Sequence, residues 1–116
     1  MWIPNNRGSK FCRSHKYLDP DTDREFWDFS FDEIGIHDTK AVIQYIKKHS
    51  GEDKISFIGF SQGATQVLCA LIQDSEWYKE NMNILINLGL LARISSDMST
   101  IARLALSNKT FFSKFL

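Results

Sequence analysis

One stretch, KISFIGFSQGATQVLCALIQD at residues 54–74, constrains the fold of this chain more than any other. Ile55 to Ile58 is a short apolar run rich in strand-forming residues, whereas Gln62 to Gln73 has the length and composition of a buried helix. Between them lies the pattern Gly59-x-Ser61-x-Gly63. In a tight strand-to-helix turn the positions two before and two after the serine crowd each other, and glycine relieves that crowding. The stretch predicts that Ser61 projects from such a turn in a strained backbone conformation.

This turn would give Ser61 a chemical role. Its hydroxyl would be presented as a nucleophile, and the Gln62 amide at the helix N-terminus would stabilise a developing oxyanion. The bare pattern arises by chance in about 4% of chains of this length, so its position between strand and helix carries the inference. The alternative, a serine in a flexible glycine-serine linker, lacks these apolar flanks.

The flanking elements indicate the fold class. Ser30-x-x-Glu33 is a capping box, which predicts a helix over residues 31–49 that Gly51 ends. Residues 83–88 form a second apolar run of strand length. The order helix, strand, helix, strand predicts an α/β fold with parallel strands joined by crossover helices. The first helix has an apolar stripe at helical spacing: Ile34, Ala41, Val42, Tyr45 and Ile46.

The two ends of the chain are less regular. Residues 1–4 have the character of the end of a third strand, stopped by Pro4, and residues 5–29 form a long polar loop. A further helix is expected around residues 98–106. The organisation predicted is one incomplete core over residues 1–94, followed by the beginning of a cap over residues 95–116.

Composition excludes several function classes. The chain has 14 basic and 14 acidic residues, and this balance argues against nucleic-acid binding. Cys12 and Cys69 are too few and too scattered for a disulfide framework or a metal site, and no cofactor is expected. No segment is apolar and long enough for a signal peptide or a membrane span, which predicts a cytosolic location for the chain as written.

Several segments in correct order resemble the acid lipase family of α/β-hydrolases: NNRG at 5–8, SHK at 14–16, FWDFSFDE at 26–33 and GFSQG at 59–63. The resemblance implies a serine hydrolase of lipid esters such as triglycerides or steryl esters, with a secretory or lysosomal location. Ser61 matches the nucleophile, and Gln62 matches the residue whose amide lines the oxyanion hole. Phe60 stands where the family usually has histidine. The sequon at Asn108 fits a secretory protein.

The rest of a catalytic triad does not follow the serine. In this superfamily the acid and then the histidine come after the nucleophile, but His15, His37 and His49 all precede Ser61. Asp74 and Asp97 do follow Ser61, yet they have no histidine to orient. His37 is expected near the packing face of the first helix. The 116 residues are therefore expected to be a central, inactive portion of a hydrolase.

Two other interpretations stay open. The chain could be a non-catalytic fragment or gene remnant that binds lipid or a partner through exposed apolar surface. It could also be a serine hydrolase of the acyl-thioesterase type, because GFSQG occurs there too, although FWDFSFDE argues against this. The sequence gives no indication of the oligomeric state.

Overall fold

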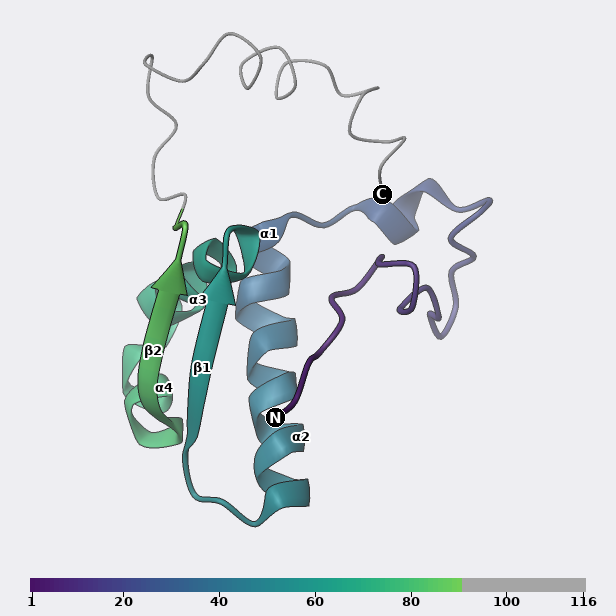
Figure 1. Cartoon of the computed structure of the whole chain (residues 1–116). Coiled ribbons are helices and arrows are strands. Elements are labelled where there is room, and N and C mark those ends of the chain that lie inside the picture. Colours follow the sequence, from purple (N-terminus) through teal and green to yellow (C-terminus); the bar gives the residue numbers. More distant parts are fainter. Residues whose placement is uncertain (91–116) are drawn as a thin grey trace, which may run out of the picture.

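The computed structural model describes residues 1–90. These residues form a mixed α/β unit in which helices and strands alternate in the predicted order (Figure 1). In chain order the elements are η1 (Arg24–Trp27), α1 (Phe31–Glu33), η2 (Ile34–Thr39), α2 (Lys40–Ser50), β1 (Ile55–Phe60), α3 (Gln62–Gln73), α4 (Ser75–Asn81) and β2 (Met82–Leu88). The short helix α4 was not predicted from the sequence.

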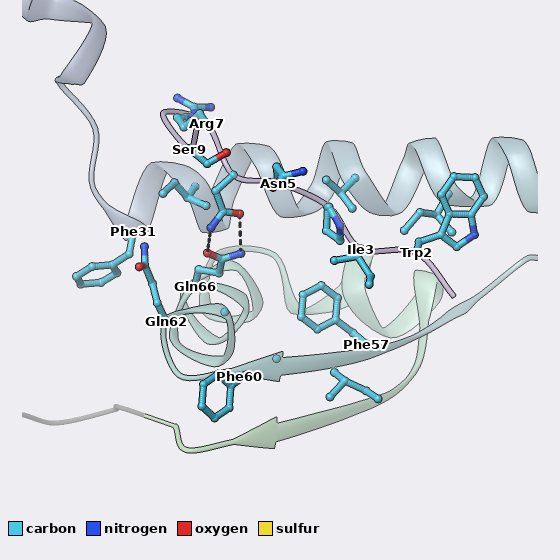
Figure 2. A pocket seen from close by; sticks show the side chains of 18 of the residues that line it. Trp2, Ile3, Asn5, Arg7, Ser9, Phe31, Phe57, Phe60, Gln62 and Gln66 are labelled. Carbon is cyan, nitrogen blue, oxygen red and sulfur yellow. Dashed lines mark hydrogen bonds between the residues drawn. The ribbon is translucent and has the colours of Figure 1, made fainter. Parts of the chain in front are cut away.

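Strands β1 and β2 form a two-stranded parallel sheet, as the order of elements predicts. Their pairing runs from Ile55 opposite Met82 to Phe60 opposite Leu88, with an irregularity between Ile55 and Ser56. Helices α2 and α3 lie on the same side of the sheet, and Phe57 points toward them whereas Phe60 points away (Figure 2). Within residues 1–90, helices therefore cover one face of the sheet, and no element covers the other.

The segment from residue 31 to residue 50 is helical throughout, as the capping box predicts. Asp32 N donates to Ser30 Oγ at 3.1 Å, and Ser30 N donates to Glu33 Oε2 at 2.7 Å. Ser30 Oγ also donates to Glu33 Oε2 at 2.6 Å, and this bond, followed by the one from Ser30 N, lowers the pKa of Glu33 to about 2. Gly51 ends the helix in the left-handed conformation, with φ of 75°. The middle of the helix, η2, is wound as a π-helix.

The core differs in detail from the predicted apolar stripe. Ile43 is fully buried, whereas Tyr45 is exposed and Ala41 faces solvent. The wider π-helical turns of η2 shift the residues that follow relative to a regular 3.6-residue repeat, so the face in contact with the core changes. Helix α3 is likewise not buried all round, because Ile72 is 75% exposed. The core consists of Ile43, Val67, Ala70, Tyr78 and Met82.

The expected third strand is not formed in the described residues. Residues 1–4 carry no strand, and the sheet contains only β1 and β2. A strand needs a hydrogen-bonded neighbour, and Pro4 lacks an amide to donate. Instead Trp2 packs against α2, with its ring centroid 6.1 Å from that of Tyr45. The predicted helix near 98–106 and the cap over 95–116 lie outside the described residues.

Candidate functional site

Ser61 occupies the turn between β1 and α3, as the sequence predicts. Its φ of 49° and ψ of −115° make it the one non-glycine residue with positive φ among residues 1–90. The Ser61 amide donates to Leu88 O at 2.8 Å, which fixes the turn to the end of β2. Its side chain is exposed. The predicted strained conformation is confirmed, and a conformation of this kind costs about 1–3 kcal/mol.

The two glycines of the pattern differ in their surroundings. A Cβ at Gly59 would lie 2.8 Å from both the N and the Cα of Ala64, closer than side chains tolerate. A Cβ at Gly63 would meet no atom of residues 1–90 within 4 Å. The expected crowding is therefore present at Gly59 and absent at Gly63 in this part of the chain, because the backbone of α3 passes over Gly59 while Gly63 faces open space.

The first turn of α3 supplies unused amides. Ala64 N makes the first bond of this turn, to Ser61 O at 3.0 Å. The amides of Gln62 and Gly63 precede it, so they have no partner within the helix. They sit at the positive end of a 12-residue helix. The arrangement can stabilise negative charge that develops beside Ser61.

The loop at residues 5–9 is tied to the helices near the turn. Asn6 Nδ2 donates to Gln66 Oε1 at 3.0 Å, and Gln66 Nε2 donates back to Asn6 Oδ1 at 3.3 Å (Figure 2). Arg7 Nε donates to both carboxylate oxygens of Asp38 at 2.9 Å. The Asp38 hydrogen bonds raise the pKa of Arg7. The sequence alone did not predict a role for Gln66 or Asp38. Their partners, Asn6 and Arg7, lie in the NNRG segment that carries the family resemblance.

A large groove begins beside this turn. Its volume is about 1610 Å³. The N-terminal segment, helix α2 and the whole of β1 line it, together with Gln62 and Gly63 next to Ser61. Figure 2 shows Ile3 close to Phe57 in this groove, with Trp2 farther along it, where it packs on α2. An apolar groove next to a candidate nucleophile suits an apolar ligand better than a charged one.

Among residues 1–90, none of the three histidines hydrogen-bonds Ser61. None of them lines the groove. His15 Nδ1 accepts from Tyr17 N and Leu18 N at 3.2 and 2.9 Å, and His49 stacks on Tyr45 with ring centroids 3.9 Å apart. His37 is exposed, so its predicted place near the packing face is wrong, because the π-helical turns of η2 direct it to solvent.

Asp74 connects α2 to the start of α4. Its carboxylate accepts from Lys40 Nζ at 2.7 Å and from Trp77 N at 3.3 Å, where it caps α4. The Lys40 hydrogen bond lowers the pKa of Asp74. Asp97 lies outside the described residues.

Residues 1–90 have neither a helix that could span a membrane nor a cluster that could hold a metal. No helix there is both long and apolar enough to cross a membrane. Across the same residues, no three histidine, cysteine or acidic side chains gather where a metal ion could be held.

A serine with positive φ between a parallel strand and a helix is the geometry of a nucleophile elbow, and the βαβ unit around it is compatible with part of an α/β-hydrolase. No family model matches the chain. Comparison with curated proteins finds homologues named lipases, including an acid lipase-like protein and a gastric triacylglycerol lipase, so the family resemblance is confirmed over the matched residues.

Three of these relatives illustrate the match. The chain is 48% identical over 71 residues to a probable lipase of Schizosaccharomyces pombe, which covers 61% of this chain and 15% of the relative. It is 46% identical over 65 residues to lipase member M of Homo sapiens, covering 56% of this chain and 15% of the relative. It is 33% identical over 106 residues to gastric triacylglycerol lipase of Bos taurus, covering 91% and 26%. The chain thus spans about a quarter or less of these proteins.

Proposed function

We propose that this chain carries the nucleophile region of a serine hydrolase that cleaves carboxylic esters of lipids. One observation supports the proposal above all others: Ser61 is held at φ 49° between β1 and α3, in a chain whose relatives are named lipases. A strained serine at this position has a cost in stability, and presenting a hydroxyl for attack explains why it is retained.

Each residue of the elbow has a role in this proposal. Ser61 Oγ gives its proton to a general base as it attacks the ester carbonyl, and the Gln62 amide stabilises the oxyanion of the tetrahedral intermediate. The intermediate collapses to an acyl-serine as the protonated alcohol leaves, and water then releases the acid. Gly59 has no Cβ, which would lie 2.8 Å from Ala64 N, so the backbone of α3 can pass close to it. Gly63 belongs to the first turn of α3. The groove that begins beside Gln62 offers apolar surface for the acyl or steryl part of the substrate.

The proposal extends to the organisation of the protein. Residues 1–94 contribute part of an α/β-hydrolase core with about three strands, and residues 95–116 begin a cap over the site. Triglycerides and steryl esters are the proposed substrates, and a secretory or lysosomal location is proposed from the named relatives. No residue of these 116 supplies the base after Ser61, so we propose that they do not turn over esters alone.

A chimera tests the nucleophile directly. Residues 2–90 replace the matching segment of bovine gastric triacylglycerol lipase, and hydrolysis of a short-chain triglyceride is measured. The chimera should hydrolyse the ester, and Ser61→Ala should lower turnover by about 10⁴-fold or more. A chimera that melts cooperatively but shows no Ser61-dependent turnover would refute the proposal.

A further inference from the structure

The polar loop over residues 5–29 contains a tight turn with a lysine and an aromatic ring at its tip. Cys12 N donates to Ser9 O at 2.9 Å and closes the turn around Lys10 and Phe11. Both tip residues are exposed, Phe11 by 77%. Lys10 Nζ lies 5.9 Å from the centroid of the Phe11 ring, within the range of a cation–π contact. The turn therefore holds an ammonium group and an apolar ring side by side.

A second turn in the same loop repeats this pair. His15 Nδ1 accepts from Tyr17 N at 3.2 Å and from Leu18 N at 2.9 Å, so a side chain closes this turn. Lys16 and Tyr17 are exposed at its tip, with Lys16 Nζ 5.0 Å from the centroid of the Tyr17 ring. Because loops run over the surface of proteins, exposed tips are typical of such turns.

The charge of this segment favours an anionic partner. Residues 1–18 contain no acidic side chain, although they include Lys10, Arg13 and Lys16. Among residues 1–90, neither Lys10 nor Lys16 takes part in an ion pair. Both ammonium groups can therefore bind a negatively charged group at the surface.

The acidic residues that follow limit this attraction. Asp21 pairs with Arg13, and the carboxylates of Asp19 and Asp23 accept from backbone amides at 2.8 and 2.7 Å. These groups keep their negative charge close to the two turns. A nucleic acid, which needs a row of cations for its phosphates, is therefore a poor match. A partner that takes up the two rings as well as the two ammonium groups is a better one.

A lysine beside an exposed aromatic ring suits the headgroup region of a bilayer. Aromatic rings such as that of tyrosine prefer the boundary between headgroups and acyl chains, and lysine is attracted to anionic headgroups. The loop is also held on the protein in advance, since Asn6 is bonded to Gln66 and Arg7 to Asp38. Binding therefore loses little conformational entropy in ordering it.

We propose that the turns at Lys10-Phe11 and Lys16-Tyr17 bind an anionic phospholipid surface. The two ammonium groups contact the oxygens of the headgroups, and the two rings enter the boundary of the acyl chains. This contact with charged lipid is separate from the neutral esters proposed as substrates. It does not depend on the chemistry of Ser61, because neither turn supplies a group to the reaction.

Co-sedimentation of the 116-residue chain with vesicles tests the contact. At low salt the chain should bind vesicles of phosphatidylserine and phosphatidylcholine in equal parts, and bind pure phosphatidylcholine vesicles at least about tenfold more weakly. Inorganic phosphate should displace it no better than sodium chloride of the same ionic strength. Equal binding to the two kinds of vesicle, release by phosphate alone, or preferential binding to single-stranded DNA would each overturn the proposal.

Matched variants separate the turns from the overall charge. Lys10→Gln and Lys16→Gln should each weaken binding to the anionic vesicles about fivefold and flatten its dependence on salt. Lys48→Gln removes the same charge from an exposed position on α2 and should bind like the parent. An equal loss in Lys48→Gln would assign binding to overall charge and contradict the proposal.

The rings give a second readout. Phe11→Ala and Tyr17→Ala should each weaken binding to the anionic vesicles at least about fivefold, because less apolar surface enters the bilayer. The salt dependence should stay that of the parent, since no charge is lost. Unchanged binding by both variants would show that the rings stay in water, and would overturn the proposal.

Discussion

The nucleophile elbow and the N-terminal segment meet at the same groove, but they are held in place by different means. Apart from the bond of Ser61 N to Leu88 O, the elbow is fixed by contacts between neighbours in sequence, such as Gly59 against Ala64 and Ala64 N on Ser61 O. The N-terminal segment is fixed by side-chain pairs far apart in sequence, Asn6 with Gln66 and Arg7 with Asp38. Short-range steric rules can therefore be read from a sequence, whereas long-range polar pairs require the fold.

The largest effect is expected at the glycine that touches the helix. Gly59→Ala places a Cβ 2.8 Å from the backbone of Ala64 and should cost about 3 kcal/mol of unfolding free energy. Gly63→Ala is the matched control, because no atom of residues 1–90 lies within 4 Å of its Cβ. It should be neutral or stabilising by up to about 1 kcal/mol, since alanine favours helix. Urea unfolding of both variants tests this, and equal costs would refute the steric difference.

Next in size is the link between the N-terminal loop and α3. Asn6→Ala leaves the Gln66 amide, which is only 7% exposed, without its partner and should cost about 2 kcal/mol. The double variant Asn6→Ala/Gln66→Leu should recover part of that loss, because no buried polar group then stays unpaired. Thermal unfolding of the single and double variants measures the coupling. Additive losses would show that the two amides act independently.

A smaller effect, of opposite sign, is expected at the elbow serine. Ser61→Gly removes the strain of φ 49° and should raise the free energy of unfolding by about 1 kcal/mol. Ser61→Ala keeps a Cβ in the same conformation and should change stability by less than about 0.5 kcal/mol. Urea unfolding of the pair isolates backbone strain from loss of the hydroxyl. If the two variants are equally stable, Ser61 stores no strain.

The helix start should give a change no larger than that at the elbow serine, and one that depends on pH. Ser30→Ala should cost about 1 kcal/mol at neutral pH. The Ser30 side chain is the main cause that lowers the pKa of Glu33 from 4.5 to about 2. A lowered native pKa stabilises above the unfolded value, so the difference between parent and variant should shrink as pH falls from 4.5 toward 2. A cost independent of pH would contradict the capping box.

Sequence reasoning succeeded where neighbours decide the structure. The capping box at Ser30, the stop at Gly51 and the turn at Ser61 all depend on residues within a few positions, and the structure confirms each. It failed where distant parts decide. After the π-helical turns of η2, Ile43 is buried and Tyr45 is exposed, the reverse of the predicted stripe. No sequence pattern predicted that Gln66 would pair with Asn6. Residues 1–4, predicted as a third strand, pair with no strand among residues 1–90.

The claim that Ser61 cannot act with these residues alone is tested most directly by ester hydrolysis. The 116-residue chain is compared with its Ser61→Ala variant. A serine hydroxyl needs a base to attack, and in subtilisin removal of the catalytic histidine lowers turnover by about 10⁶-fold. His15, His37 and His49 all lie outside the groove. We therefore expect no p-nitrophenyl ester turnover above the variant, and no labelling of Ser61 by a fluorophosphonate. Ser61-dependent turnover or labelling would mean that one of these histidines serves as the base, and would contradict the proposal that Ser61 depends on a base outside these residues.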